Sequence, residues 1–363
     1  MSYDYLIVGA GLAGIVSAER LSSRGNKILL IDKREHIGGN CYDYFDNDGN
    51  YIQKYGPHIF HTKYKEVWDY IKNFIEMNDY KHKVFVYLEG KLVPLLFNLN
   101  SVDLFFDKEK SDKIKEKLIN SYGKESKITI FNLGNSNEPL LQELFKKIYR
   151  DIFVDYTCKQ WDLDPSEMDK SVLSRVPIFI SNINNYFPGQ YQGVPVKGFT
   201  DLFNKMLGSK NIHIKLNTDF FDISNGEYKK IIYTGPLDRF FNYKFGKIRY
   251  RRLKLSFEKF YTSSFQINSV INYPSPKYKF TRITEYNKFL SIKNPSTVIS
   301  KEFPSWDEGT LAWPLQTKDN LELIDSYLSE ASGLDNVTFF GRLAEGKYYD
   351  MDTIIKEGLR RWN

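Results

Sequence analysis

Three glycines near the start of the chain, and an acidic residue beyond them, have the spacing of a turn that binds a dinucleotide. Gly9, Gly11 and Gly14 form a GxGxxG pattern, and Asp32 follows in the same segment. The first glycine permits a tight turn, the second lets a pyrophosphate approach the backbone, and the third lets a helix pack closely on a strand. The helix N-terminus attracts phosphate, and the acid accepts hydrogen bonds from ribose hydroxyls.

The elements that must position these residues can be read from the same stretch, YDYLIVGAGLAGIVSAERLSSRGNKILLID. An apolar run precedes the glycines, a helical pattern with small residues follows them, and a second apolar run ends in Asp32. This order predicts a βαβ unit. Because strand, helix, second strand and terminal acid agree, the pattern favours dinucleotide binding over a tight turn in an ordinary α/β protein.

A second glycine pair, Gly38 and Gly39, follows the acid almost at once. A nicotinamide dehydrogenase would continue straight into another crossover, whereas this segment indicates a backbone that wraps closely around a larger cofactor, with a polar hairpin turn at DNDGN. FAD is therefore the predicted cofactor. Nearby His58 and His61 are interpreted as packed histidines with one satisfied nitrogen each, because no third metal ligand is in view.

A polar run near the other end of the chain, GRLAEGKYYDMD from Gly341 to Asp352, precedes an apparent last helix. If NVTFFG before it is another strand of the nucleotide-binding sheet, this loop lies at the carboxyl edge, where open α/β sheets bind ligands. The two ends of the chain would then meet over one cofactor. Alternatively, Arg342 is a surface charge, and Tyr348 and Tyr349 are packing groups; both interpretations stay open.

The middle of the chain changes character twice. Residues from about 101 to 152 are predicted to be mainly helical, with a break at NLGNSNE and a solvated charged face over residues 107–117. Residues 243–302 contain alternating segments separated by Pro, Asn and Ser, which predicts an antiparallel sheet.

Aromatic and arginine side chains in three further stretches offer stacking surface for a base and guanidiniums for a second diphosphate. The aromatic residues are Tyr156, Trp161, Tyr186 and Tyr191, the arginines are Arg175 and Arg282, and Thr157 adds a hydroxyl beside Tyr156. Each alone has a simpler interpretation, since Trp is usually a core residue and a strand Arg is usually solvated.

Composition excludes several classes of function. The 51 basic and 45 acidic side chains give a formal net charge of +6, too small and too dispersed for a nucleic-acid-binding protein. The chain has two Cys, no secretory hydrophobic region before the first strand, and no apolar run of about 20 residues that could span a bilayer, so a cytoplasmic location is expected. We find no paired-carboxylate arrangement, no nucleophilic Cys with a partner base and no metal cluster, so a cofactor must carry the chemistry.

Over essentially its whole length the chain resembles the bacterial UDP-galactopyranose mutase family, flavoenzymes that interconvert the six- and five-membered ring forms of a nucleotide-linked galactose. The matching blocks, in order, are VGAGLAG, HIGGN, YGPHIFHT, YTCKQW, NNYFPGQYQGVPVKGFT, IIYTGPLD, TRITE, SKEFP and GRLAEGKYYDMD. The resemblance implies an α/β fold with an FAD-binding Rossmann-like domain, an inserted helical domain and an antiparallel β-sheet domain. The implied boundaries are 1–80, 196–242 and 315–363 for the FAD-binding domain, 98–170 for the helical domain with a mobile substrate loop at about 162–177, and 81–97, 171–195 and 243–314 for the sheet domain.

Taken position by position, the resemblance also implies site residues. Those implied to contact FAD are Gly9, Gly11, Gly14, Asp32, Lys33, Gly39, Asn40, His58, Ile59, Asp219, Phe220, Arg342, Tyr349 and Asp350. Those implied to bind the substrate are His82, Tyr156, Thr157, Trp161, Arg175, Tyr186, Asn272, Arg282, Trp313 and Tyr348. Among the substrate residues, Tyr156, Thr157 and Trp161 would hold the uridine. Arg175, on a loop that closes over the substrate, and Arg282 would grip the diphosphate.

In the family, N5 of reduced FAD attacks the anomeric carbon and displaces the nucleoside diphosphate. The sugar ring opens, closes through its 4-hydroxyl, and the returning diphosphate expels the flavin with no net redox change. The resemblance therefore implies Arg175, Arg282 and His58 as catalytic residues, with His58 beside the isoalloxazine. It implies reduced FAD and an external reductant such as NAD(P)H, and it allows a homodimer; no metal is expected.

Two positions depart from the family pattern and leave the exact substrate open. Trp313 stands where a Tyr usually bonds a phosphate, and His82 stands where an Asn is usual. The same chemistry on UDP-N-acetylgalactosamine or a dTDP-linked fucopyranose is therefore an alternative. An FAD amine oxidase and a non-catalytic nucleotide-sugar binder are alternatives of other classes, although the arginines would repel an ammonium substrate.

Overall fold

The computed structural model describes residues 2–161, 176–223, 226 and 228–363. The chain forms two compact units: the first comprises Met1–Tyr80, Gln190–Leu253 and Trp306–Asn363, and the second Lys81–Gly189 and Lys254–Ser305. The expected helical domain falls within the second unit, whereas residues 190–195, 243–253 and 306–314 of the expected sheet domain belong to the first. The division into three domains stays a prediction.

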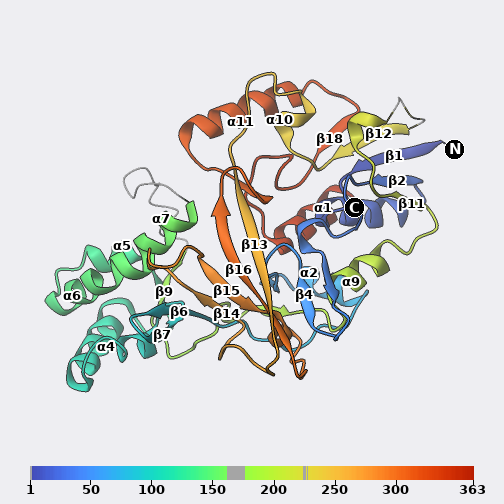
Figure 1. Ribbon diagram of the computed structural model, residues 1–363. Helices are drawn as coiled ribbons and strands as arrows, with labels where there is room; N and C mark the ends of the chain where they lie inside the picture. The colour runs from blue at the N-terminus through green and yellow to red at the C-terminus, as the bar shows by residue number, and fades with distance from the viewer. Residues whose placement is uncertain (1, 162–175, 224–225, 227) are drawn as a thin grey trace. The chain divides into compact units, whose positions relative to one another are not determined.

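A parallel sheet of five strands forms the centre of the first unit (Figure 1). Its order is β11 (Ile212–Lys215), β2 (Ile28–Ile31), β1 (Tyr3–Val8), β12 (Tyr228–Tyr233) and β18 (Val337–Phe339). All neighbouring pairs run parallel. The predicted βαβ unit is confirmed, because α1 (Leu12–Ser22) joins β1 to its neighbour β2. The predicted strand in NVTFFG is confirmed as β18, which pairs with β12.

Both faces of this sheet are covered. A side-chain carbon at Gly14 would lie 1.9 Å from the Gly9 carbonyl oxygen and 3.3 Å from Ile7, so α1 packs on the face that carries Ile7. Helix α1 also contacts α9 (Phe199–Met206) and α12 (Met351–Arg361), the predicted last helix. Leu6 and Val8 point to the opposite face, as alternation along a strand requires. There they pack in a cluster that includes the aromatic ring of Phe240.

Shorter elements complete the first unit. The predicted turn at DNDGN is confirmed, because it joins the antiparallel strands β3 (Asp43–Phe45) and β4 (Tyr51–Gln53). The remaining strands are β5 (Phe60–Thr62), paired with β10 (Tyr191–Gly193), and β17 (Thr310–Pro314), paired with the first residues of β13 (Tyr250–Phe260). The helices are α2 (Lys65–Lys72), α10 (Leu237–Phe240) and α11 (Lys318–Ala331), with 3-10 turns at Gly39–Cys41 and Phe220–Asp222.

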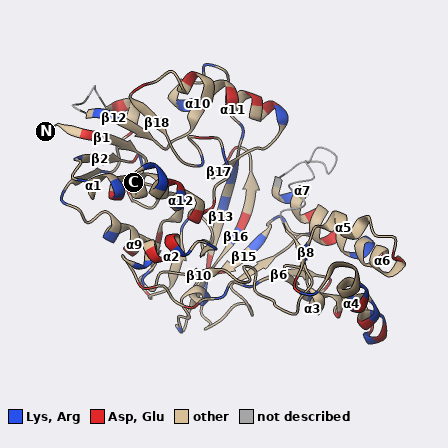
Figure 2. Ribbon diagram, turned by 180° about the vertical axis from the view of Figure 1, so that it is seen from behind, with Lys and Arg blue, Asp and Glu red and all other residues tan. Residues whose placement is uncertain are grey.

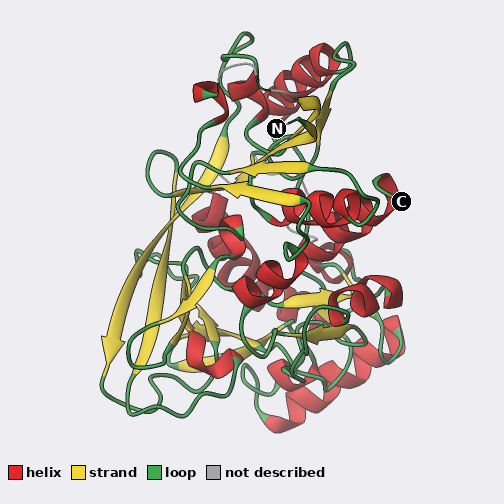
Figure 3. Cartoon of the chain, turned by 90° about the vertical axis from the view of Figure 1, so that its right-hand side faces the viewer, coloured by secondary structure: helices red, strands yellow, loops and turns green. Residues whose placement is uncertain are grey.

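The second unit contains a mixed sheet, whose strands are drawn as yellow arrows with those of the first unit in Figure 3. Its order is β13, β16 (Thr297–Ser305), β15 (Arg282–Glu285), β14 (Val270–Asn272), β6 (Val84–Leu88) and β7 (Lys91–Leu95), and a 3-10 turn at Tyr286–Phe289 follows β15. The antiparallel prediction is confirmed for β14 with β15 and β15 with β16, but β14 pairs parallel with β6. No hairpin connects these two strands, so no turn imposes the antiparallel direction on them.

The predicted helical stretch is also in the second unit. It contains α3 (Leu99–Val102), α4 (Lys108–Tyr122), α5 (Ile130–Gly134), α6 (Pro139–Ile148) and a π-helical segment (Tyr149–Val154) that leads into α7 (Asp155–Trp161). A short strand that was not predicted, β8 (Lys127–Ile128), pairs with β9 (Ile178–Phe179).

The charged run of α4 is a solvated face, as predicted. Ser111, Ile114 and Leu118 are its buried residues, spaced on one face of the helix. Lysine and acidic side chains alternate along the rest of it (Figure 2). Among the residues that the structure describes, no helix has the length and apolar character needed to cross a membrane.

Candidate functional site

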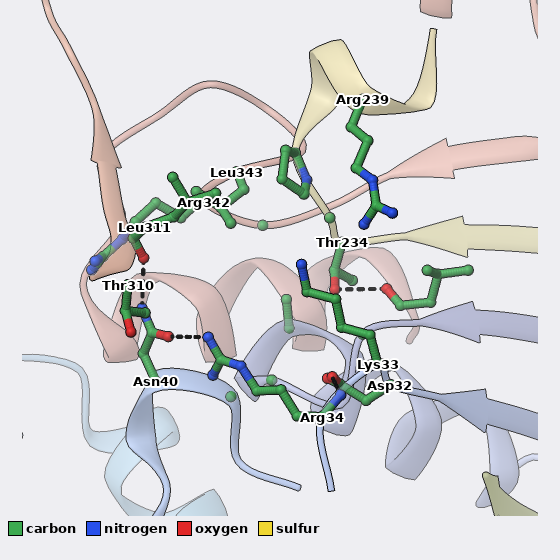
Figure 4. A pocket seen from close by; sticks show the side chains of 18 of the residues that line it. Asp32, Lys33, Arg34, Asn40, Thr234, Arg239, Thr310, Leu311, Arg342 and Leu343 are labelled. Carbon is green, nitrogen blue, oxygen red and sulfur yellow. Dashed lines mark hydrogen bonds between the residues drawn. The ribbon is translucent and has the colours of Figure 1, made fainter. Parts of the chain in front are cut away.

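A cavity of about 750 Å³ lies in the first unit at the carboxyl ends of the parallel strands. Its walls come from both ends of the chain, because the turn after β1, the end of β2 and the loop after β18 all contribute (Figure 4). The residues expected to contact FAD that line it are Gly9, Gly11, Asp32, Lys33, Gly39, Asn40, His58, Asp219, Phe220, Arg342 and Tyr349. Gly14, Ile59 and Asp350 are outside this lining; Gly14 packs α1 onto the sheet and Asp350 precedes α12.

The turn after β1 and the glycine pair after β2 approach each other closely. Gly39 has φ +56°, and a side-chain carbon there would lie 2.8 Å from Cα of Gly11. The amide of Gly38 donates to the carbonyl of Ala10 at 2.7 Å, and the Ala10 amide donates to Oδ2 of Asp32 at 2.7 Å. The two glycine motifs therefore form one backbone-lined wall that any side chain at Gly39 would obstruct.

Arg34 lines this wall and was missed by sequence reasoning. Its Nη2 donates to Oδ1 of Asn40 at 3.0 Å, and Nδ2 of Asn40 donates to the Leu311 carbonyl at 2.9 Å, as Figure 4 shows. Nη1 of Arg34 is buried and has no hydrogen-bond partner within the described part of the chain. A buried guanidinium nitrogen without an acceptor, at a cavity wall, fits an anionic ligand. Its place two residues after the acid of the βαβ unit was the available signal.

At another wall, an ion pair joins Asp219 to Arg239, a second residue that was not predicted. Nη2 of Arg239 lies 2.7 Å from Oδ2 of Asp219, and the Phe221 amide donates to Oδ1 at 3.2 Å. Burial raises the pKa of Asp219, but the hydrogen bond from Arg239 and that from the Phe221 amide outweigh burial and lower it. Asp219 is therefore an anion at neutral pH.

The loop after β18 shows which interpretation of Arg342 holds. Its guanidinium is partly buried, lines the cavity, and donates to the carbonyls of Ala312 (3.0 Å) and Tyr349 (2.5 Å). It also lies over the ring of Tyr348, 4.8 Å from the centroid. The interpretation of Arg342 as a surface charge is therefore wrong.

His58 and Cys41 also line the cavity, whereas His61 does not. His58 is half-buried, and its Nδ1 lies 2.8 Å from the Gly56 carbonyl, which can only accept, so Nδ1 carries a proton. His61 bonds Gln190 through Nδ1 at 3.0 Å, as expected for a packed histidine. Burial raises the pKa of the Cys41 thiol to about 12, so this thiol is protonated and is no nucleophile at neutral pH.

In the second unit, Arg282 on β15 meets Tyr156 on α7. Nη2 of Arg282 donates to the Tyr156 hydroxyl at 2.9 Å, and its Nε lies 3.4 Å from the carboxylate of Glu302, which is 2% exposed. Burial lowers the pKa of Arg282, but Glu302 and then Tyr156 outweigh it and raise the pKa, so the guanidinium stays charged. Asn272 stands opposite Arg282 across the strands, and its Oδ1 is buried without a hydrogen-bond partner in the part described.

Other expected substrate residues have neighbours within their own units. In the second unit, the His82 ring stacks on Phe187 with centroids 5.8 Å apart, and the His82 carbonyl accepts from the Tyr186 amide at 2.8 Å. In the first unit, the rings of Trp313 and Tyr348 lie 6.1 Å apart, edge to face.

Thr157 and Trp161 on α7 and Arg175 beyond it in the sequence complete the group. Thr157 donates to the Phe153 carbonyl one helical turn earlier, at 2.5 Å. Trp161 ends α7, and its side chain is outside the described residues, as are Arg175 and most of the expected substrate loop.

Lys159 on α7 is a residue that the sequence did not point to. Its ammonium donates to the carbonyls of Tyr273 (2.8 Å) and Ser275 (3.1 Å), directly beyond β14. Burial lowers the pKa of Lys159 to about 8. The helix with Tyr156 and the strand with Asn272 are thus connected through one half-buried cation.

Comparison with known proteins places the chain among nucleotide-sugar mutases. A family model described as UDP-galactopyranose mutase matches residues 151–348, and one described as an NAD(P)-binding Rossmann-like domain matches residues 7–74. A probable UDP-galactopyranose mutase from Klebsiella pneumoniae is 36% identical, over 98% of this chain and 93% of its own length. A dTDP-fucopyranose mutase from Escherichia coli is 33% identical, over 98% and 96%. A crystal structure of reduced UDP-galactopyranose mutase aligns with a TM-score of 0.74 and 14% identity, over 100% and 93% of the chains, which confirms the predicted fold class.

Proposed function

The chain belongs to the UDP-galactopyranose mutase family of isomerases, and from this premise we propose that it interconverts UDP-galactopyranose and UDP-galactofuranose with reduced FAD. The observation that carries the proposal is the cavity whose walls join the N-terminal glycine motifs to Arg342 near the C-terminus. A βαβ unit that binds a nucleotide by itself would not need residues from the end of the chain to complete its site.

The residues of the cavity fit FAD. The buried Nη1 of Arg34 needs an anionic acceptor, and the backbone of Gly11 leaves no room for a side chain at Gly39. We propose that these groups hold the pyrophosphate, that Asp32 accepts from a ribose hydroxyl, and that His58 borders the isoalloxazine. The two oxygens of Asp32 already accept from the amides of Ala10 and Arg34, and each oxygen has a second lone pair for a ribose donor.

When bound and reduced, FAD would supply the nucleophile, its N5 atom, for a covalent bond to the anomeric carbon with no net redox change. The chain's own part is to bind, orient and stabilise charge. Arg282, charged and held by Tyr156, would stabilise the negative charge that develops on the leaving diphosphate. Arg175 would share this role. The buried Oδ1 of Asn272, which has no hydrogen-bond partner in the described part of the chain, would accept a hydrogen bond from a hydroxyl of the substrate.

The remaining substrate contacts are proposed from the family resemblance. Tyr156, Thr157 and Trp161 would hold the uridine, and Tyr186 and Tyr348 would add hydroxyls to the diphosphate site. A reductant such as NAD(P)H, a homodimer and a cytoplasmic location stay predictions.

A second candidate substrate is a dTDP-linked fucopyranose. The observation that favours it is the relative named dTDP-fucopyranose mutase, 33% identical over nearly the whole of both chains. Trp313 and His82, which depart from the usual family residues, are the positions at which we expect the difference in substrate to be decided. UDP-N-acetylgalactosamine is retained as a third candidate substrate, because the departures at Trp313 and His82 also leave the sugar open.

The decisive experiment is a substrate panel with the dithionite-reduced protein. UDP-galactofuranose, UDP-N-acetylgalactosamine in its furanose form and dTDP-fucofuranose are each incubated with reduced and with oxidised protein, and products are separated by chromatography. The proposal predicts conversion of UDP-galactofuranose by the reduced protein alone. Quenching of Trp fluorescence without conversion would indicate a binder, and oxygen consumption with amines would indicate an oxidase.

A further inference from the structure

The side-chain amide of Gln53 forms two hydrogen bonds with the backbone of His58. Oε1 of Gln53 accepts from the His58 amide at 2.7 Å, and Nε2 of Gln53 donates to the His58 carbonyl at 2.9 Å. Gln53 is fully buried on β4, whereas His58 lines the cavity. The His58 amide and carbonyl belong to two successive peptide groups, so two simultaneous hydrogen bonds from one planar group fix the backbone conformation at His58 more firmly than a single bond would.

The amide of Gln53 is itself held by buried polar groups. Its Nε2 also donates to the Tyr51 hydroxyl at 3.0 Å, and that hydroxyl donates to Oδ2 of Asp43 at 2.5 Å. Tyr51 and Gln53 are 0% exposed and Asp43 is 3% exposed. Since Nε2 donates to both the hydroxyl and the His58 carbonyl, its orientation in the network is defined, and an exchange of amide oxygen and nitrogen would place like groups together.

The network ends at the beginning of helix α9. The carboxylate of Asp43 accepts from the amides of Phe199 (2.6 Å) and Thr200 (2.8 Å), the first two residues of that helix. These amides are among the groups that a helix leaves without an internal partner, and the helix dipole favours a carboxylate there. A continuous chain of hydrogen bonds therefore runs from a helix terminus through Asp43, Tyr51 and Gln53 to the backbone of a cavity residue.

The backbone of His58 belongs to no helix or strand that would supply its hydrogen-bond partners. His58 lies in the turn after Gly56, a residue with φ +110°, outside any helix or strand. Without a partner, its peptide would depend on the imidazole contact with the Gly56 carbonyl for orientation. The β3–β4 hairpin supplies the missing partner from an element held by its own ladder.

We infer that Gln53 is a positioning residue that fixes the backbone of His58 at the wall of the flavin site, with Asp43 and Tyr51 holding Gln53 in place. The inference rests on the proposed function, because it takes FAD as the occupant of the cavity. Because His58 lines the cavity, a fixed orientation of its backbone and imidazole changes the relative affinity of the site for reduced and oxidised flavin, which differ in the hydrogen atoms and charge that they present. Gln53 is fully buried and does not line the cavity, so it acts through His58.

The test compares Gln53→Glu with the wild-type holoenzyme. This substitution keeps the shape and the oxygen that accepts from the His58 amide, but removes the Nε2 donor. We expect the ratio of affinities for reduced and oxidised flavin to change about tenfold, which equals about 30 mV in the two-electron midpoint potential. We also expect kcat to fall with little change in KM, because the substrate contacts are untouched.

A second substitution protects the test against misfolding. Tyr51→Phe removes the hydroxyl between Gln53 and Asp43 but leaves both bonds to His58, so it should shift the potential in the same direction by less. Asn320→Leu is the matched control: Asn320 is also a buried amide that accepts from a backbone amide (Arg249, 2.8 Å) and donates to a backbone carbonyl (Leu315, 2.7 Å). It does not line the cavity, and its loss should lower stability without shifting the potential.

The outcomes separate this inference from the proposed function. If the wild-type protein binds no flavin, the proposed function fails first. If it binds flavin and both Gln53→Glu and Tyr51→Phe retain the wild-type potential and the wild-type ratio of kcat to KM, then Gln53 is only structural and the inference is wrong. A shift in Asn320→Leu equal to that in Gln53→Glu would also overturn it, because the effect would then follow from general destabilisation.

Discussion

The cavity of the first unit and the polar cluster of the second unit are built in different ways. One wall of the cavity is formed by backbone, where Gly11 and Gly39 approach each other and amides donate to Asp32. The cluster consists of side chains, with the partly buried Arg282 held between Tyr156 and the buried Glu302. The first depends on the space that glycines leave, and the second on charges that burial makes costly unless they are paired.

This difference shows where each region is vulnerable. In the first unit, the charged pair of Asp219 and Arg239 is partly exposed, and both side chains are stabilised in their charged forms. In the second unit, burial lowers the pKa of Lys159. Adding volume should be most harmful in the first region, because that region depends on the space that glycines leave. Removing or changing a charge should be most harmful in the second region, because burial there acts on charged side chains.

The largest effect is expected for Arg282→Ala. Loss of one preorganised charge at the proposed diphosphate site should lower kcat about 100- to 1,000-fold. Leaving Glu302 buried without its partner should also cost about 3 to 5 kcal/mol of stability. Turnover with reduced flavin and urea unfolding measure the two effects. Adding Glu302→Gln should restore part of the stability and none of the activity; near-normal turnover of Arg282→Ala would contradict the assignment.

Gly14→Ala should have the next largest effect and tests the volume side of the contrast. The new methyl group would lie 1.9 Å from the Gly9 carbonyl oxygen, so α1 must move away from the sheet. We expect a loss of about 3 kcal/mol in stability and a large fall in the flavin content of the purified protein. Gly333→Ala is the control, because its nearest neighbour, the Glu330 carbonyl oxygen, is 3.5 Å away. Full flavin retention by Gly14→Ala would break the contrast.

A smaller, pH-dependent effect is expected at Lys159. Its folded pKa of about 8 lies below the unfolded value of about 10.4, so the unfolded chain binds more protons between these limits. The contribution of Lys159 to stability should therefore rise as pH increases from 8 to 10. Urea unfolding of the wild type and Lys159→Met across this range measures it. Lys113→Met is the control, since Glu109 raises the pKa of exposed Lys113; equal pH trends in both variants would exclude the burial effect.

The smallest effect is expected for Asp219→Asn. The pKa of Asp219 is lowered in the folded state, so its contribution is present above the unfolded pKa of about 3.9 and is lost as pH falls through the lower folded value. For a partly exposed pair we expect about 1 kcal/mol or less at pH 6. Thermal unfolding of the wild type and Asp219→Asn at pH 6 and pH 3 gives the comparison. A difference that grows at pH 3 would contradict the assigned direction.

Sequence patterns predicted the first unit well because their signals are local. The βαβ unit, the DNDGN hairpin turn and the strand before Gly341 are each encoded within a few adjacent residues, and each is confirmed. The same was true of the helices between residues 101 and 152. The parallel pairing of β14 with β6 was not predicted, because it joins segments far apart in the chain and no turn sets their direction.

The polar partners were the part that sequence could not supply. Arg34, Arg239, Lys159 and Gln53 carry no motif, and their importance comes from what lies within hydrogen-bond distance of them. Arg342 shows the same limit from the other side, since its residue type and loop allowed two interpretations. Only its bonds to the Ala312 and Tyr349 carbonyls separated them.

The sequence by itself determined the nucleotide-binding turn, the order of elements and the family, because glycine spacing and apolar periodicity act over short stretches of chain. Tertiary structure alone decided which polar groups are buried, paired and directed at the cavity. Burial and hydrogen bonding depend on neighbours that folding brings together from distant positions. The pKa of a group such as Arg282 therefore depends on the folded structure and not on its local sequence.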